Sequence, residues 1–269
     1  AVNANSKDFL IKLGIWNNIK TKPQLINKII IKDFINSEPL IFSNETEAMG
    51  NVIFNSELLK IARQKLKYLK ILKKNININT DAISPNKILN INNLNYSFKK
   101  IVICVGKSIL SDTTQKSLVF DNGVYSYVGF FKHKKDHNGV AYELFNKEGP
   151  LAVLPSPSSN NKRSTFIYST KDQTTYPKIQ SIIKKGFTST HGQITFDNKI
   201  QRFPVIPHLT KYNERYIYIG DSLKSIHPVA GQGWNLGIKD IQSLMNLIDK
   251  YPLESEAFQS IYYSRRLIE

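Results

Sequence analysis

A short apolar segment near the end of the chain runs directly into a turn that could bind a ligand. Residues Tyr216–Ile219 predict a strand, and Gly220 and Asp221 follow it at once. A glycine-rich turn at residues 230–233 then predicts the start of a helix. A helix N-terminus presents unpaired N–H groups and partial positive charge, and glycine lets a ligand approach the backbone. These residues predict a site for an anion or a polarised oxygen.

The helix after this turn should bury one face. Apolar residues recur at the spacing of an amphipathic helix, at Ile241, Leu244, Met245 and Ile248. We therefore expect these four side chains to face the core and to fix the N-terminus of the helix beside the turn.

Several residues of this segment are candidates for ligand binding, and each has a simpler alternative. Asp221 lies at the end of a strand, where α/β sheets bind ligands, although Asp also forms turns. Main-chain N–H groups could come from Gly231, Gln232 and Gly233, which could equally form a helix cap. Asn235 could bind a ligand or cap the helix.

The wider pattern resembles a known motif. Gly220-Asp221 followed by His227-Pro228-x-Ala230-Gly231-Gln232-Gly233-x-Asn235-Leu236-Gly237 resembles the second flavin-binding motif of the FAD-dependent aromatic-ring monooxygenases, the class A flavoprotein hydroxylases. Within that family it is most similar to the ubiquinone-biosynthesis hydroxylases. The resemblance implies that Asp221 binds the ribityl chain of FAD and that the Gly-Gln-Gly amides face the pyrimidine end of the isoalloxazine. It also implies that His227 lies near the cofactor without acting as a base. The implied cofactor-binding residues are Gly220, Asp221, Pro228, Ala230, Gly231, Gln232, Gly233 and Asn235.

The same resemblance implies an activity. In that family, reduced FAD reacts with O2 to give a C4a-hydroperoxide, which transfers oxygen to an electron-rich phenolic ring. We therefore expect hydroxylation of a phenolic ubiquinone precursor, with NAD(P)H or another electron donor. No side chain of the chain is assigned a catalytic role. The segment from His137 to Pro155 resembles the family's sheet that walls the substrate cavity, although ordinary strand packing would also explain each residue alone.

Four departures from the family pattern, at the two ends and at two internal positions, weaken the case for activity and favour an alternative. Residues 1–16 resemble the family's segment after its GxGxxG unit, and residues 263–266 resemble the start of its "Y-x-x-x-R" helix. We therefore expect a fragment without the GxGxxG unit and the C-terminal end, which binds FAD weakly and is inactive when isolated. Val105 stands where the family has the Asp of its "A-D-G" motif, and Lys224 replaces a His. The alternative is a non-catalytic remnant or a scaffold subunit of a biosynthetic assembly.

Composition limits the remaining function classes. With 269 residues and 41% hydrophobic residues, the chain is expected to be globular. The formal charge of +16 comes mainly from Lys, because only six of 37 cationic residues are Arg; we therefore expect no nucleic-acid partner. Weak association with an anionic membrane surface or a biosynthetic complex fits the charge better.

The cysteine and histidine content predicts a cytoplasmic protein that has no metal site. The single Cys104 excludes an internal disulfide, and in its apolar strand it should be buried. The five His residues show no metal-ligand spacing, so we expect no metal site. Without an apolar run long enough to span a bilayer, we expect a cytoplasmic protein that could lie peripherally on the inner membrane face.

The order of expected elements indicates an α/β fold. An incomplete Rossmann-like FAD-binding domain should comprise residues 1–20, 51–120 and 211–269, interleaved with an antiparallel substrate-binding sheet domain at 21–50 and 121–210. We expect helices at 6–19, 55–66 and 176–187, and strands at 68–72, 90–98 and 100–105. Residues 125–170 should form a β-meander.

Overall fold

The computed structural model describes most of the chain, in two compact units that are each considered alone. The described residues are 1–33, 35, 38–44, 46–68, 88–91, 94–111, 117–171, 174–197, 199–211, 216–227, 231–253 and 255–268. The first unit comprises residues 1–62, 121–206 and 227–232; the second comprises 63–120, 207–226 and 233–269. The functional roles given to the predicted domains stay predictions, because this division does not say which segments hold a ligand.

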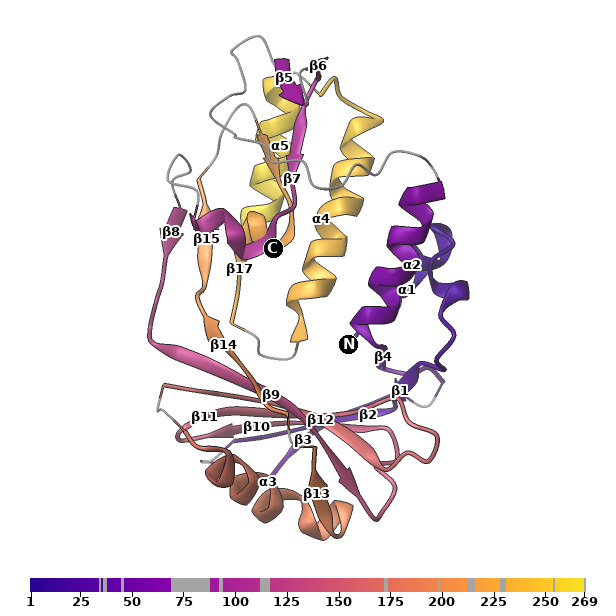
Figure 1. Ribbon diagram of the computed structural model, residues 1–269, viewed down its shortest axis with the longest axis vertical. Coiled ribbons are helices and arrows are strands. Elements are labelled where there is room, and N and C mark those ends of the chain that lie inside the picture. Colours follow the sequence, from indigo (N-terminus) through magenta and orange to yellow (C-terminus); the bar gives the residue numbers. More distant parts are fainter. Residues whose placement is uncertain are drawn as a thin grey trace. The chain divides into compact units, whose positions relative to one another are not determined.

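An eight-stranded sheet forms the centre of the first unit (Figure 1). Its strand order is β13-β9-β12-β11-β10-β2-β3, and β14 also pairs with β9. The strands are β2 (Lys28–Asp33), β3 (Leu40–Ser43), β9 (Val124–His133), β10 (Val140–Asn146), β11 (Gly149–Pro155), β12 (Arg163–Thr170), β13 (Ile194–Phe196) and β14 (Gln201–Val205). All pairs are antiparallel except β10 with β2.

The predicted meander over residues 125–170 is correct for three strands and wrong for the first. β10, β11 and β12 follow one another as neighbours, but β9 pairs with β12 rather than with β10. The reason lies in long-range pairing: Phe131 opposite Ser164 and Tyr127 opposite Tyr168 place the large apolar side chains of β9 over the core. Local turn signals carry no information about this choice of partner.

Helix α3 (Tyr176–His191) covers one face of the sheet (Figure 1). Its buried residues Ile179, Ile183 and Phe187 recur at i, i+4 and i+8 and pack on Phe131 and Phe166. Pro occupies the first helical turn, where a missing N–H costs no hydrogen bond. The predicted helix at 176–187 is therefore confirmed and is one turn longer.

The N-terminal helix is shorter than predicted. Helix α1 (Ala4–Lys12) ends because Gly14 adopts φ +61°, and Ile15 N–H donates to the Leu10 carbonyl. This left-handed glycine terminates a helix, which the apolar spacing had extended to residue 19. A 3₁₀ turn follows at Trp16–Asn18. The antiparallel pair β1 (Gln24–Ile26) and β4 (Gly50–Val52) and helix α2 (Asn55–Tyr68) complete the N-terminal part.

The second unit contains a short parallel sheet with helices (Figure 1). β16 (Tyr216–Tyr218) pairs in parallel with β7 (Ile101–Ile103), and the buried side chains of β16 pack with α4 (Gly233–Ile248) and α5 (Glu256–Ile268). Tyr262 and Tyr263 of α5 donate from their hydroxyls to the carbonyls of Tyr218 (2.9 Å) and Tyr216 (3.1 Å). These bonds join the helix to the strand that leads into Gly220.

Two further small sheets belong to the second unit. β15 (His208–Thr210) pairs with β8 (Ser117–Val119) and with β17 (Lys224–Ser225). β5 (Ile88–Ile91) and β6 (Leu94–Ser97) form an antiparallel pair, so the single strand predicted at 90–98 is wrong because the chain reverses within it. Of the strand predicted at 68–72, Tyr68 ends α2 and the other residues lie outside the described part.

Candidate functional site

The turn at Gly220–Ser222 is held by hydrogen bonds on both sides. Gly220 has φ +58°, and its amide donates to Oδ2 of Asp240 at 2.7 Å. Nε2 of His208 donates to the Asp221 carbonyl at 2.8 Å. Both Asp240 and His208 are buried, whereas Asp221 is exposed. The backbone of the turn is therefore fixed, and the Asp221 side chain is accessible to a ligand.

Ser222 connects the same turn, through hydrogen bonds, to the segment after β7 and to the end of β15. The Gly106 amide, directly after the β7 region, donates to Ser222 Oγ at 2.9 Å. Thr210 Oγ1, at the end of β15, donates to the Ser222 carbonyl at 2.7 Å. Ser222 itself is fully buried. Three segments distant in sequence thus converge on one turn, which is typical of a ligand site built at the ends of strands.

Helix α4 begins beside this turn with an open N-terminus. A Cβ added at Gly233 would meet no described atom within 4 Å, so the first residue of the helix faces open space. A Cβ at Gly220 would lie 3.7 Å from Cα of Gly237, one turn further along α4, so helix and turn approach at van der Waals distance. Gly233 is the first residue of α4, and the N–H groups at the start of an α-helix have no acceptor within the helix backbone itself. This arrangement suits a polar or anionic ligand.

The residues just before α4 are described with the first unit. Gly231 has φ +59°, and a Cβ there would also meet no described atom within 4 Å; Gln232 connects it to the helix. His227 is half-buried, burial lowers its pKa, and its buried Nδ1 has no hydrogen-bond partner among the residues the structure describes. Pro228 and Ala230 lie outside the described residues. The cofactor-binding roles of all eight candidates stay predictions.

The inward face of α4 differs from the predicted one. Leu244 is buried and Ile241 packs on the core as expected, but Met245 is 46% and Ile248 is 44% exposed. The buried positions are instead Asp240, Leu244 and Leu247. The helix is rotated because Asp240 faces inward to accept the Gly220 amide. An Asp at i, followed by Leu at i+4 and i+7, was a signal for this residue that the search for apolar spacing missed.

The end of β7 also corrects a prediction. Cys104 is exposed rather than buried, because β7 ends at Ile103 and the chain leaves the sheet there. Partial desolvation, with a smaller contribution from Asp240, raises the pKa of its thiol. Val105, which replaces the family's Asp, is 54% exposed. An apolar side chain at this position offers no hydrogen bond to a ligand.

The part of the chain that the structure describes shows neither a metal cluster nor a membrane-spanning helix. No group of three or more His, Cys, Asp or Glu side chains in that part of the chain is arranged to hold a metal ion. No described helix combines the length and apolar character needed to cross a membrane.

Comparison with known proteins identifies the family. The model of the FAD binding domain family matches residues 116–255, which include the turn, the start of α4 and its buried face. The chain belongs to the FAD binding domain family. The predicted relation of this chain to FAD-dependent proteins is thereby confirmed.

Relatives of this FAD-binding domain include ubiquinone hydroxylases. Ubiquinone hydroxylase UbiM of Neisseria meningitidis is 22% identical over 271 residues, covering 90% of this chain and 57% of the relative. Ubiquinone hydroxylase UbiL of Rhodospirillum rubrum is 29% identical over 123 residues, covering 42% of this chain and 28% of the relative. The chain thus spans less than two thirds of the length of either relative.

Solved structures confirm the fold class of the FAD-binding domain. A flavin-dependent halogenase from Xanthomonas campestris superposes with a TM-score of 0.76 at 10% identity, over 100% of this chain and 66% of that one. At this identity the match shows the fold alone. The prediction of an α/β FAD-binding fold combined with a largely antiparallel sheet is correct.

The residues at the turn fit FAD. Within the second unit, a Cβ at Gly233 would meet no described atom within 4 Å, so a planar ring can approach the helix start there without meeting a side chain. The exposed Asp221 can accept hydrogen bonds from a polyol chain, and its backbone is fixed by His208. By contrast, Val105 contributes no polar contact. The fit therefore rests on the Gly220–Asn235 segment.

Proposed function

We propose that the chain is the FAD-binding part of a monooxygenase that hydroxylates a phenolic ring of a ubiquinone precursor. The observation that supports this proposal most strongly is the fixed turn at Gly220–Asp221 beside the open N-terminus of α4. The chain belongs to the FAD binding domain family and is similar to ubiquinone hydroxylases. These similarities supply the class of reaction. Bound FAD would supply the activation of O2 and the oxygen transfer.

The protein's own residues have positioning roles in this proposal. Asp221 would hold the polyol chain, and N–H groups at the start of α4 would stabilise negative charge on the ring system. Asp240 and His208 would keep the turn in place, because each forms a hydrogen bond with the backbone of the turn. Electrons from NAD(P)H or another donor, and association with a membrane surface or a biosynthetic assembly, stay predictions from the sequence.

A labelling experiment tests the proposal. The chain would be mixed with FAD that has been reduced by dithionite, with a short-chain prenylated phenol, and then with heavy-isotope-labelled O2. If the chain is active as proposed here, and not the inactive fragment expected from the sequence, mass spectrometry will find one labelled oxygen atom in the ring of the product, with less product from Asp221→Ala. Chemical reduction removes the dependence on an unknown electron donor. Label-free product, or labelled product at the same level without protein, would contradict the proposal.

A non-catalytic role is the second candidate, and Val105 favours it. This exposed apolar residue stands where the resemblance implies a carboxylate that helps to hold FAD. In the same labelling experiment a scaffold subunit would give no labelled product although its fold, followed by circular dichroism, is intact. Val105→Asp would then be the informative variant, because restored FAD binding would attribute the loss to this position.

A further inference from the structure

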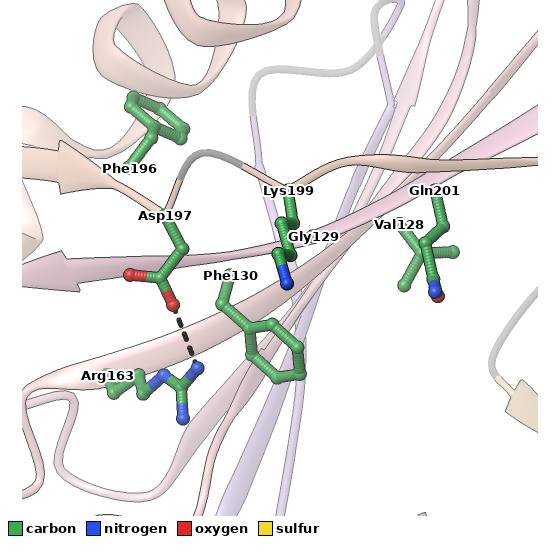
Figure 2. Close-up of a pocket in the computed structure, with 8 residues that line it drawn as sticks. All are labelled: Val128, Gly129, Phe130, Arg163, Phe196, Asp197, Lys199 and Gln201. Atoms are coloured by element: carbon green, nitrogen blue, oxygen red, sulfur yellow. Dashed lines mark hydrogen bonds and ion pairs between the residues drawn. The ribbon is translucent and has the colours of Figure 1, made fainter.

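A pocket in the first unit lies apart from the residues assigned to FAD. Its volume is about 590 Å³, within the range of about 300–1,000 Å³ that is usual for small-molecule sites. It lies where β13 and β14 both pair with the same edge of β9, and Figure 2 shows the residues that line it. The lining residues are Val128, Gly129, Phe130, Arg163, Phe196, Asp197, Lys199 and Gln201.

The side chain of Arg163 forms one wall of the pocket, and two contacts hold its guanidinium in place. Arg163 Nη2 donates to Oδ2 of Asp197 at 2.8 Å, and its Cζ lies 4.3 Å from the ring centroid of Phe130. The carboxylate and the ring together fix the guanidinium plane. The buried Nε–H of Arg163 has no hydrogen-bond partner within the described part of the chain. The Arg163 side chain as a whole is 29% exposed, so part of it forms this wall.

A second cation lies beside this wall. Lys199 is exposed and forms no ion pair with any residue that the structure describes. Figure 2 shows its side chain and that of Gln201 projecting the same way from their segment, above Val128 and the Phe130 ring. With two cations and one carboxylate, the lining carries a net charge of +1. An anion is therefore favoured over a cation.

The uncharged part of the lining is flat and aromatic. Phe130 and Phe196 offer ring surfaces, and Val128 adds an aliphatic one. Stacking on such surfaces stabilises planar ligands beyond the burial of area alone. We propose that this pocket binds a small aromatic carboxylate, with its ring against Phe130 and Val128 and its carboxylate at Lys199, beside the guanidinium of Arg163. This inference goes beyond the proposed function and does not rest on it.

A matched pair of probes tests the ligand class. Purified full chain would be titrated with 2-naphthoate and with 2-naphthylmethanol, which has the same ring system without the charge, by isothermal calorimetry and ligand-observed NMR. We expect saturable binding of the carboxylate and binding of the alcohol that is about tenfold weaker or more, since charge-assisted hydrogen bonds are lost. Equal affinity for the two probes, or no binding of 2-naphthoate at millimolar concentration, would overturn the proposal.

Variants then place the ligand. Lys199→Gln should weaken 2-naphthoate binding about tenfold, whereas Lys185→Gln, at an exposed position of α3, should leave it unchanged. Asp221→Ala should also leave it unchanged, which separates this pocket from the predicted FAD surface. Loss of binding in Asp221→Ala with retention in Lys199→Gln would place the ligand elsewhere and contradict the proposal. Circular dichroism of each variant shows whether it is folded.

Discussion

The amide of Gly220 donates a hydrogen bond of 2.7 Å to the buried carboxylate of Asp240. This bond joins the turn after β16 to the middle of α4, so the helix that begins at Gly233 is fixed relative to Asp221 through its own inward face. A charged acceptor in a buried position strengthens such a bond. The bond explains why an acidic residue occupies the apolar side of α4.

Removal of this carboxylate should destabilise the protein. Asp240→Ala leaves the half-buried Gly220 amide without this charged acceptor, and we expect the free energy of unfolding to fall by about 2–3 kcal/mol. Asp240→Asn keeps an acceptor oxygen and should cost roughly half as much. Urea unfolding followed by circular dichroism measures both values. Equal stability of wild type and Asp240→Ala would show that the bond contributes nothing.

Two glycines in contact should respond in opposite ways to alanine. Gly220 has φ +58°, so Gly220→Ala should lower the free energy of unfolding by about 1–2 kcal/mol. Gly237 lies inside α4, and its added Cβ would be 3.6 Å from the Gly220 Cα, an ordinary contact. Gly237→Ala should therefore be neutral or stabilising by up to about 1 kcal/mol. Urea unfolding measures the stability of both variants. If Gly237→Ala lowered the free energy of unfolding as much as Gly220→Ala, the contact between the two glycines would be tighter than described.

The start of β11 should be intolerant of any side chain. Gly149 has φ +138°, and an added Cβ would lie 1.9 Å from the carbonyl oxygen of Ser169. Gly149→Ala should therefore cost about 3 kcal/mol or more, from steric overlap and backbone strain together. Gly123→Ala is the matched control, because Gly123 also has a positive φ but no described atom near its added Cβ; it should cost only about 1 kcal/mol. Similar losses in thermal unfolding for the two variants would contradict this explanation.

Three buried histidines should make the first unit sensitive to acid. His133, His137 and His191 lie together, and the ring centroids of His133 and His191 are 4.6 Å apart. Burial, and then the two neighbouring imidazoles, lowers the pKa of His191 from 6.5 to about 4. Burial also lowers the pKa values of His133 and His137. Between about pH 4 and pH 6.5 the folded protein therefore binds fewer protons than the unfolded chain.

Because the unfolded state takes up the extra protons, the contribution of these histidines to the free energy of unfolding should be fully present above about pH 6.5. It should fall as the pH drops toward about 4. Each proton contributes a slope of up to about 1.4 kcal/mol per pH unit. His191→Phe keeps an aromatic ring and should make this dependence shallower. Urea unfolding between these pH values tests it, and an unchanged slope in His191→Phe would assign the acid sensitivity to other groups.

Local signals predicted the ligand turn better than they predicted its support. Gly220, Asp221 and the start of α4 were found from glycine positions and residue order, which depend on neighbouring residues. Asp240 and His208 were missed because their roles depend on contacts with a turn that is 20 and 13 residues away in sequence. The exposure of Cys104 was wrong for a related reason, since its apolar surroundings in sequence do not show where β7 ends.

In the eight-stranded sheet, too, local sequence predicted the positions of strands but not their pairing. Strand positions in residues 125–170 followed from alternation and turn residues, whereas the pairing of β9 with β12 follows from how the large side chains share one core. Gly14 ended α1 through a left-handed conformation that apolar spacing ignores. The pocket around Arg163 had no local signal, because its walls come from four separate strands.

Titration of the folded chain with FAD, followed by quenching of flavin fluorescence, tests the central claim that the Gly220–Asn235 segment binds the cofactor. Wild type, Asp221→Ala and Asp249→Ala would be compared, the last being an exposed Asp of the same unit placed after α4. We predict saturable quenching, weakened about tenfold or more by Asp221→Ala and unchanged by Asp249→Ala. Absence of quenching in a folded sample, or equal affinity in all three proteins, would contradict it.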